Sequence, residues 1–571
     1  MVRDNGTSKI ASLSGVVTIF KRFFRLADRQ GIKKPWLEFY DSGIPACLST
    51  PEKTMIDVLD DTVERNGQRV FLIYFGRKMT YSRFRSLVSR CATGLKSLEI
   101  SKGDRIALIL PNIPQFLIAY WAILEIGAVV VAINPILSER EMLDQMNQAD
   151  VKAAVVLDRI YSRLVSVGKK PVVPVVTASV EQYMPAYLSL AMSLERRRLQ
   201  IQRTAAIHFE RLLKYPAMEL STRCIPGDPA VMIFTGGVTG EPKAAVLSHR
   251  NLVANTEQAC AWISDLKNEV ILAVLPLIHS YGMTACHHVS VRSGAVLILE
   301  PRFSLKRIVN DIRKYKVTLF PGVPTMFSAI HNFAAKKTLN LSGIRACISG
   351  GAPLSGELKE NFEKMTGGKL VEGYGLTEAS PIVLCNPIHG LNKTGSVGLP
   401  WPGTLARIAH LKTGLPLAPY QKGELQIKGP QVMHGYWKKP EETRKIISAD
   451  GWLSTGDIAY FDRDGYFYIV DRKKDLIFHG GSNIYPGEVE GVLMEHPHIL
   501  EAAVIGIPDK HYGEVIKAFI VADPVQSITE NDIIRFCEDK LAKYKIPGEI
   551  EFRTQLPKNF LGKVIHRKLR E

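Results

Sequence analysis

The chain has 571 residues, of which 46% are hydrophobic and 23% charged, a balance typical of a globular protein too long for one compact core. Its 73 Lys and Arg outnumber 56 Asp and Glu, and the formal charge of +17 indicates an anionic partner such as a nucleotide, a coenzyme, a membrane surface or a nucleic acid. The eight cysteines include no Cys-x-x-Cys pair, which favours reduced thiols on a cytosolic face over a disulfide framework or a structural zinc site.

Residues 1–40 form a basic amphipathic segment, in which apolar side chains are interspersed with Lys and Arg. This pattern favours two placements, either on an anionic bilayer or against the protein's own surface. It lacks the apolar core and small-residue cleavage site of a signal peptide. The most apolar stretch, Phe116 to Ile133, is interrupted by Glu125 and Gly127, so it predicts a buried helix and then a buried strand over Ala128 to Ile133 rather than a membrane span.

From Met79 onward, helical patterns alternate with short runs of Val, Ile and Leu, which predicts βαβ units with helices on both faces of a sheet. The expected strands are Ile106–Leu110, Ala128–Ile133, Ala153–Leu157, Val270–Leu275, Ala295–Leu299, Val317–Phe320 and Ala346–Ser349. Residues 168–225 interrupt this rhythm, because Pro171 and Pro174 break a Val-rich run and Arg196 to Arg198 follow an apolar stretch. We expect an insertion there, which either contacts a membrane or presents an ordinary solvated helix face.

The last third of the chain changes character twice. Short strands and turns from Gly395 to Val470 predict a small distorted β-barrel, and the charged run that follows predicts a hinge over residues 471–475. We therefore expect an α/β protein in which residues 1–40 are the basic segment, 41–470 are a large domain of two βα-layered sheets plus the barrel, 471–475 are the hinge, and 476–571 are a small mobile α+β lid domain.

An apolar run from Ala230 to Phe234 leads into a loop of Thr and Gly, as expected for a strand that ends in a sharp turn. Glycines let backbone N–H groups approach an anion, threonines add hydroxyl donors, and a lysine adds positive charge. The residues of these three kinds are Gly236, Gly237 and Gly240, Thr235 and Thr239, and Lys243. The loop predicts a phosphate site, with an ordinary surface turn as the alternative. It is not a Walker A loop, because Ala244 stands where that motif has Ser or Thr.

Further stretches downstream carry candidate site residues. Each has a purely structural interpretation when taken alone, as a core aromatic, a turn residue or a solvated charge, but their order and spacing together argue against chance. The turn at Gly351, Ala352 and Pro353 is suited to a flat base, and Tyr374, Gly375, Thr377 and Glu378 bring an aromatic face, a hydroxyl and a carboxylate together. Asp457 is a candidate for two ribose hydroxyls, and Lys563 stands on a glycine-containing tail.

On these motifs the chain resembles the acyl-adenylate-forming superfamily, which contains acyl-CoA synthetases, firefly-type luciferases and peptide-synthetase adenylation domains. The resemblance extends from about Thr80 to Arg570 and is greatest to bacterial long-chain fatty-acid CoA ligases. The stretches that carry it are Lys102–Leu108, Gly375–Pro381 with Asn386-Pro387, Gly395–Pro400, and Asp457–Asp475 leading into Asn483–Pro486.

The resemblance implies a two-step reaction in which a carboxylate attacks the α-phosphate of Mg-ATP, and the thiol of coenzyme A then displaces AMP from the acyl-adenylate. It makes residues 41–470 the AMP-binding domain, with the 235–243 loop on the β- and γ-phosphates and Glu378 and Thr235 on Mg²⁺. Thr377 would contact the α-phosphate. Tyr374, Gly375, Gly351, Ala352 and Pro353 would hold adenine, Asp457 and Arg472 the ribose, and Lys563 the reacting carboxylate and α-phosphate.

The same resemblance gives the C-terminal residues a second task. Rotation of the lid domain about Lys474 would exchange Lys563 for Gly480 and Gly481, which would line a channel for coenzyme A. His279 matches a family position near the acyl carboxylate, although a lone His in an apolar run is more often a core residue.

Two positions depart from the family pattern, and two other functions remain as alternatives. Val238 replaces a hydroxyl residue of the phosphate loop, and Ala244 replaces the usual Gly, so weaker ATP binding is expected. The alternatives are an acyl-AMP ligase that serves a carrier protein, and a non-catalytic nucleotide or acyl binder. Fatty acid, ATP and coenzyme A are the expected partners, together with peripheral contact with an anionic membrane on the cytoplasmic face. No nucleic-acid motif occurs, and the sequence sets neither acyl chain length nor oligomeric state.

Overall fold

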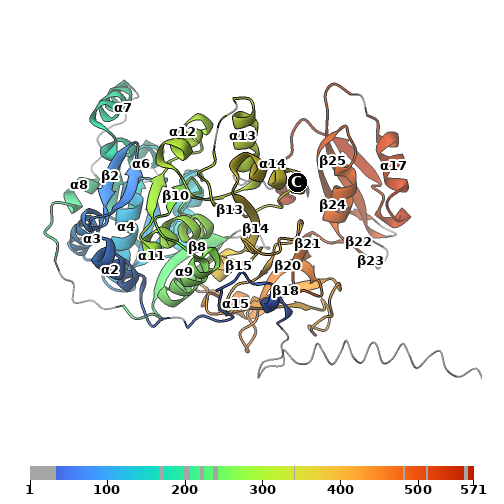
Figure 1. Cartoon of the computed structure of the whole chain (residues 1–571), viewed down its shortest axis with the longest axis horizontal. Coiled ribbons are helices and arrows are strands. Elements are labelled where there is room, and N and C mark those ends of the chain that lie inside the picture. The colour runs from blue at the N-terminus through green and yellow to red at the C-terminus, as the bar shows by residue number, and fades with distance from the viewer. Residues whose placement is uncertain are drawn as a thin grey trace, which may run out of the picture.

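The structure is a computed structural model of the chain (Figure 1). It describes residues 34–49, 51–166, 173–198, 206–218, 224–235, 242–337, 339, 341–479, 482–509, 512–526, 528–558 and 564–570. The expected amphipathic segment therefore lies outside the described residues up to residue 33, and the described chain begins at Lys34.

A nine-stranded sheet carries most of the predicted βα units of residues 70–400. Its order is β16-β15-β14-β13-β12-β10-β11-β1-β2, and the strands from β1 through β11, β10, β12 and β13 to β14 are parallel, with antiparallel strands at both edges. The strands are β1 (Val70–Tyr74), β2 (Arg77–Thr80), β10 (Val270–Ala273), β11 (Val296–Leu299), β12 (Leu319–Gly322), β13 (Ala346–Ser349), β14 (Lys369–Gly375), β15 (Ile382–Cys385) and β16 (Leu399–Pro400).

An eight-stranded sheet in the order β19-β9-β8-β4-β3-β5-β6-β7 forms the second layer. Its strands are β3 (Arg105–Ile109), β4 (Val129–Ala132), β5 (Val151–Leu157), β6 (Val175–Ala178), β7 (Ile207–His208), β8 (Pro229–Thr235), β9 (Lys243–Ser248) and β19 (Gly435–Tyr436). The strands predicted over residues 106–157 and 270–349 are confirmed in these two sheets.

The interpretation of residues 168–225 as an insertion outside the βα rhythm is partly wrong. Strand β6 pairs in parallel with β5, and β7 pairs with β6, so both extend the eight-stranded sheet. Pro174 is compatible with this pairing because it directly precedes the strand and contributes only its carbonyl, which accepts from the N–H of Ala154 at 3.0 Å. The proline pattern was therefore a strand boundary rather than the end of the sheet.

Helices fill the space between the sheets and cover their outer faces. Along β3, Ile106 and Leu108 face the central helices while Ala107 and Ile109 face the outer ones, which is the two-residue alternation of a sheet buried on both sides. The central helices are α2 (Met55–Asn66), α3 (Tyr81–Lys96), α4 (Pro114–Glu125), α9 (His249–Ile263) and α11 (Val289–Ser293). The outer helices are α5 (Glu139–Gln148) and α6 (Asp158–Ser166) on one side, and α12 (Leu305–Tyr315), α13 (Pro324–Ala335) and α14 (Gly356–Thr366) on the other.

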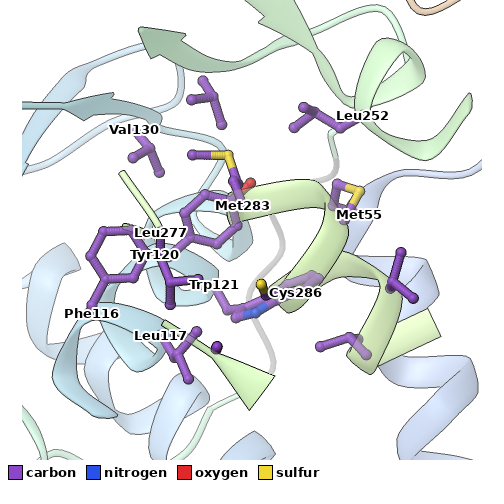
Figure 2. Close-up of a cluster of buried hydrophobic side chains, with 14 of the residues drawn as sticks. Met55, Phe116, Leu117, Tyr120, Trp121, Val130, Leu252, Leu277, Met283 and Cys286 are labelled. Atoms are coloured by element: carbon purple, nitrogen blue, oxygen red, sulfur yellow. The ribbon is translucent and has the colours of Figure 1, made fainter. Parts of the chain in front are cut away.

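The predicted buried helix is α4, whose residues Pro114 to Leu124 are all buried. Figure 2 shows its Phe116 and Tyr120 beside Met283, which lies on η4 (Met283–His288), the π-helical turn that follows α10 (Ser280–Gly282). This packing confirms a helix and strand in place of a membrane span at residues 116–133. Among the described residues, no helix is both long and apolar enough to cross a membrane.

Residues 399–472 add a four-stranded antiparallel sheet to the large unit. Its strands β17 (Leu405–Ala409), β18 (Gly423–Lys428), β20 (Leu453–Phe461) and β21 (Phe467–Arg472) are hydrogen-bonded in linear order in the region where the sequence predicted a small barrel. Helix α15 (Pro440–Ile446) lies between β19 and β20 in the chain. After β21, the turn η6 (Lys473–Asp475) contains Lys474 and leads to the C-terminal part.

The C-terminal part is a five-stranded sheet with helices on both faces, at the right of Figure 1. Its elements are β22 (Ile477–His479), β23 (Ser482–Ile484), α16 (Pro486–Met494), β24 (Ile499–Asp509), β25 (Gly513–Ala522), α17 (Glu530–Glu538), β26 (Glu549–Phe552) and α18 (Arg567–Arg570). The predicted α+β pattern is confirmed. The remaining helices are α7 (Ala186–Arg198), α8 (Phe209–Leu212) and the short turns η2 (Pro35–Phe39), η3 (Val180–Tyr183), η5 (Thr377–Ala379) and η7 (Lys543–Lys545).

All eight cysteines are free in the fold.

Candidate functional site

A cavity of about 170 Å³ opens at the carboxyl ends of β10, β13 and β14 in the nine-stranded sheet. Parallel strands of an α/β sheet place ligand sites at this edge, because the connecting loops diverge there and leave a crevice. Five residues singled out from the sequence line the cavity together, namely His279, Gly351, Tyr374, Gly375 and Thr377. The strand order of the sheet thus brings these five residues together, although they are far apart in the sequence.

His279 and Thr377 form one polar side of this cavity. Burial lowers the pKa of His279 to about 4, so its imidazole is neutral at physiological pH. Ser280, the next residue, lies with its hydroxyl 3.3 Å from the hydroxyl of Thr377. A neutral imidazole and two hydroxyls offer hydrogen bonds without a charge of their own, which suits a carboxylate that must keep its nucleophilic character.

Tyr374 connects the cavity to a buried ion pair. Its hydroxyl donates a short hydrogen bond to Oδ2 of Asp457, and Nε of Arg472 lies 2.7 Å from Oδ1 of the same carboxylate. Asp457 and Arg472 are cross-strand partners on β20 and β21, so sheet register fixes the pair. Asp457 is only 2% exposed. Tyr374 and Arg472 each hold one oxygen of this carboxylate and so fix its orientation. Each oxygen keeps a further lone pair, so the carboxylate can still accept from two hydroxyls.

Gly351, Ala352 and Pro353 follow β13, and Gly351 has a φ of +81°, a conformation that glycine adopts without steric cost. Gly351 is exposed and Ala352 is half-buried, while Pro353 points outward as an exposed residue. Of these three residues, Gly351 lines the cavity together with Tyr374, and it contributes only backbone atoms.

Two of the phosphate-loop candidates, Thr235 and Lys243, lie at the ends of the antiparallel strands β8 and β9. Thr235 at the end of β8 is paired with Lys243 at the start of β9. Gly236, Gly237, Thr239 and Gly240, as well as Val238, lie outside the described residues, so their predicted roles stay predictions. Ala244 is a strand residue, 6% exposed, whose methyl group packs in the core beneath the hairpin. That packing explains why alanine is accommodated there.

Glu378 and Thr235 converge on one tyrosine that the sequence analysis did not identify. The hydroxyl of Tyr436 donates to Oε1 of Glu378 at 2.8 Å. Burial and the charge of Glu378 raise the pKa of Tyr436 above its ordinary value, and a hydrogen bond from Thr235 offsets only part of that rise. The Tyr436 hydroxyl thus lies between the two predicted metal ligands. Their carboxylate and hydroxyl oxygens are ligands that Mg²⁺ prefers, and the described residues contain no cluster of three or more His, Cys, Asp or Glu suited to a metal ion. The donor set therefore fits an ion that shares its coordination with phosphate oxygens and water.

Lys243 has a protein counter-ion of its own. Its ammonium lies 2.5 Å from Oε2 of Glu442 on α15, and 5.5 Å from the centroid of the Tyr436 ring. The Lys243 side chain is only 10% exposed, so most of its contacts are with protein rather than water. The charge predicted for a phosphate is present in the site and is already paired.

The C-terminal candidates are described only in part. Lys474 lies in η6 between the four-stranded and five-stranded sheets, as expected for a hinge residue. Gly480, Gly481 and Lys563 lie outside the described residues. The chain is described again from Val564, which bridges to Lys558, and the N–H of Ile565 donates to the carbonyl of Pro557 at 2.8 Å. Hydrogen bonds therefore close both ends of the stretch that contains Lys563.

Comparison with models of protein families shows which family the chain belongs to. The family model described as "AMP-binding enzyme" matches residues 59–437, and the model described as "AMP-binding enzyme C-terminal domain" matches residues 488–563. The chain belongs to the AMP-binding enzyme family. The expected superfamily resemblance is thereby confirmed.

Individual members of the AMP-binding enzyme family extend the likeness over nearly the whole chain. A long-chain-fatty-acid–CoA ligase of Bacillus subtilis is 42% identical over 551 residues, which cover 94% of this chain and 98% of the relative. The crystal structure of ATP-bound MatB from Rhodopseudomonas palustris superposes with a TM-score of 0.78 at 27% identity, covering 91% of this chain and 98% of that one. The o-succinylbenzoate CoA synthetase of Bacillus subtilis, solved with its acyl-adenylate intermediate, gives a TM-score of 0.75 at 27% identity, covering 91% and 99%.

In this AMP-binding enzyme, sequence reasoning missed Tyr436 and Glu442. Both lie within 436–442, where Gly-Tyr-Trp and a run of charged residues resemble an ordinary exposed turn. They reach the site because β19 pairs with β9, which places Tyr436 opposite Ala245. No local pattern predicts that pairing, which joins strands almost two hundred residues apart.

Proposed function

We propose that this protein activates a long-chain fatty acid with ATP, through an acyl-adenylate, and transfers the acyl group to coenzyme A. The observation that carries the proposal is the cavity at the sheet edge, where His279 and Thr377 lie beside Tyr374 and its partner Asp457. Family membership supports ATP-dependent acyl activation, and the names of the relatives support the fatty acid.

In the first step, a carboxylate oxygen of the acid forms a bond to the α-phosphorus of ATP, and the bond from that phosphorus to the bridging oxygen of pyrophosphate breaks. Negative charge increases on the α-phosphoryl oxygens and on the leaving group, so donors and cations are needed rather than a nucleophilic side chain. Thr377 donates to the α-phosphate, Lys243 faces the leaving pyrophosphate, and Lys563 approaches from the C-terminal part. Mg²⁺, held by Glu378 and Thr235, neutralises phosphate charge when bound.

The nucleotide is oriented by groups that do not react. The two oxygens of Asp457 receive the ribose hydroxyls, and Arg472 fixes that carboxylate through an ion pair at 2.7 Å. Tyr374 and the turn from Gly351 to Pro353 enclose the adenine. Fixing ribose and base places the α-phosphorus at Thr377, which converts a bimolecular encounter into a reaction at one position.

In the second step, the sulfur of coenzyme A forms a bond to the acyl carbon, the bond to AMP breaks, and the thiol proton leaves with water or AMP. His279 remains neutral and can accept a hydrogen bond near the acyl group. We propose that rotation about Lys474 brings Gly480 and Gly481 to the site for this step, as the coenzyme needs an opening that Lys563 would close.

The test is incubation of the purified protein with ATP, Mg²⁺, coenzyme A and a mixed panel of acids, followed by mass analysis of the products. Acyl-CoA with AMP and pyrophosphate is expected, with the largest yield from long-chain acids. Acyl-AMP that forms but never reaches coenzyme A would instead indicate transfer to a carrier protein. Absence of any adenylate or pyrophosphate with every acid would refute the enzymatic function. A normal ATP requirement in this assay would show that Val238 replaces a hydroxyl without loss.

We also propose peripheral contact of the protein with an anionic membrane on the cytoplasmic side. Tyr187 and Leu190 on α7 are 72% and 63% exposed, and α7 lies at the upper left of the molecule in Figure 1. Arg313 and Lys314 near the C-terminal end of α12 are exposed basic side chains. Apolar side chains that enter the headgroup layer beside lysines favour anionic lipids.

Co-sedimentation with vesicles tests this contact. Binding to vesicles with anionic lipid, weaker with neutral lipid and weaker at high salt, is expected for the native chain. The double variant Tyr187→Ser, Leu190→Ser should lose most of that binding while keeping acyl-CoA synthesis in detergent. Deletion of residues 1–30 tests the N-terminal segment separately, and unchanged binding by that deletion variant would count against that segment.

A further inference from the structure

Glu442 holds two lysines at once. Oε2 lies 2.5 Å from the ammonium of Lys243, and Oε1 lies 2.5 Å from the ammonium of Lys445. Each carboxylate oxygen therefore has its own cation. These hydrogen bonds from Lys243 and Lys445 lower the pKa of Glu442 to about 2, so the carboxylate is ionised under all ordinary conditions.

The two lysines differ sharply in their surroundings. The Lys243 side chain is 10% exposed and starts strand β9, whereas the Lys445 side chain is 67% exposed on α15. Helix α15 is anchored to β19 because the N–H of Tyr436 donates to the hydroxyl of Thr443 at 2.9 Å. Since β19 is paired with β9, the carboxylate of Glu442 is held at a fixed place over the phosphate-loop hairpin. The contact is thus built into the sheet rather than formed by two free surface side chains.

We propose that Glu442 is a positioning residue that releases Lys243 to the polyphosphate of ATP, keeps Lys445 as its own partner, and takes Lys243 back when pyrophosphate leaves. The inference rests on the proposed function, because it assigns Lys243 to the β- and γ-phosphates. Glu442 touches neither substrate nor reacting atoms, and it acts only through Lys243.

Because Glu442 and the polyphosphate compete for the ammonium of Lys243, the proposal predicts the direction in which each substitution changes ATP affinity. A carboxylate beside Lys243 opposes a polyphosphate in two ways, since it occupies the same donor and repels the incoming negative charge. Lys445 weakens that opposition because it neutralises Glu442 after Lys243 has moved. Removing Glu442 should therefore strengthen ATP binding, and removing Lys445 should weaken it.

The experiment measures dissociation constants of MgATP and of AMP by calorimetry on the full-length protein. Glu442→Gln should tighten MgATP binding about two- to fivefold, and Lys445→Ala should weaken it by a similar factor. Adding Lys445→Ala to Glu442→Gln should change nothing further, since Lys445 acts through that carboxylate. AMP lacks the β- and γ-phosphates, so its affinity should be the same in all variants. In single-turnover assays, Glu442→Gln should also slow the release of pyrophosphate.

Glu441→Gln is the matched control. Glu441 is 76% exposed on the same helix and pairs with Arg444, so its loss removes one carboxylate without touching Lys243. Unchanged or weaker MgATP binding by Glu442→Gln would overturn the inference, because a merely structural carboxylate cannot tighten binding when it is removed. A shift of equal size with AMP or with Glu441→Gln would also overturn it. If the unmodified protein did not bind MgATP at all, that result would instead contradict the proposed function.

Discussion

At the scale of single residues, the site depends on side chains that place other side chains. Tyr436 illustrates this, because its hydroxyl donates to Glu378 while its ring lies beneath Lys243. One aromatic residue therefore links the group assigned to the metal with the group assigned to phosphate. A hydrogen bond to an ionised partner of this kind contributes about 1.5–3 kcal/mol, more than a neutral one.

Tyr436→Phe removes that hydroxyl and keeps the ring. We expect the KM for MgATP to rise about tenfold or more, since Glu378 loses its fixed donor, with little change in melting temperature. Steady-state pyrophosphate release at varied MgATP measures the effect. Tyr460→Phe, which removes a hydroxyl from a stacked tyrosine pair away from the cavity, serves as the control and should leave the KM unchanged. An equal effect of both substitutions would contradict the role given to Tyr436.

Glu372 is a second residue with an unusual environment. It precedes the cavity residue Gly373 on β14 and is 9% exposed. Burial raises the pKa of its carboxyl to about 8 from an ordinary value of 4.5, so the folded protein keeps a proton that the unfolded chain loses. A raised carboxyl pKa contributes stability at low pH, and that contribution declines as pH rises from 4.5 to 8.

Glu372→Gln should remove this pH dependence. Relative to the native chain, the variant should gain on the order of 2–4 kcal/mol in free energy of unfolding between pH 5 and pH 8. Urea denaturation at several pH values provides the measurement. Glu360→Gln, on the exposed face of α14, should show no such trend. A constant difference between variant and native chain across pH would mean that Glu372 is ionised in the fold.

At the scale of elements, local patterns predicted the pieces that are continuous in sequence. The run Val270–Leu275 became β10 and the apolar stretch that begins at Phe116 became α4, because two-residue and helical periodicity are local properties. Tyr436 and Glu442 could not be found this way. Their place depends on the pairing of β19 with β9, which is decided by packing between distant strands. The same is true of residues 168–225. Strand β6 pairs with β5, and the sequence pattern of β5 does not indicate that pairing.

The C-terminal tail has an ion pair that responds to pH. Nε2 of His566 lies 2.9 Å from Oε1 of Glu490 on α16. Burial lowers the pKa of His566, but the hydrogen bond to Glu490 and the charges of Glu490, Asp475 and Asp471 together raise it above its ordinary value of 6.5. Arg570 lies 3.5 Å from Asp475 and is the other cation of this group. A raised histidine pKa contributes stability below pH 6.5 and loses it as pH rises through the higher folded value.

We therefore expect the tail at residues 564–570 to dock more firmly at pH 6 than at pH 9. Because this tail follows Lys563 directly, adenylation should decline on the alkaline side. His566→Gln should lower tail protection in hydrogen exchange at pH 6 and leave it near the native value at pH 9, and His566→Arg should keep the tail protected at both pH values and remove the alkaline decline. Hydrogen exchange of the tail peptide and pyrophosphate release over pH 6–9 provide the two measurements. An alkaline decline that persists in His566→Arg would assign it to another group.

At the scale of the whole molecule, the proposed two-step reaction predicts two arrangements of the C-terminal part. The segment after β21 crosses from one sheet to the next within η6, and acidic side chains beside it contact the C-terminal part. The N–H of Gly487 donates to Oδ2 of Asp471 at 2.7 Å, and Lys422 lies 4.6 Å from the ring centroid of Tyr485. These polar contacts can separate and re-form in water at low cost, unlike a continuous apolar interface. The arrangement is compatible with rotation about Lys474.

If each arrangement serves one step, a substitution of Lys563 should impair adenylation and leave thioester formation unchanged. Lys563→Ala should reduce acyl-AMP formation on the order of a hundred- to a thousandfold, since a cation at the developing charge of the transition state is lost. Thioester formation from supplied acyl-AMP and coenzyme A should stay near the native rate, because that step uses the other arrangement. Lys540→Ala removes a lysine from an exposed pair with Glu495 in the same part of the chain and should affect neither step. Equal loss of both half-reactions in Lys563→Ala would mean that both steps use Lys563 in the same arrangement, and rotation would then have no role in exchanging it.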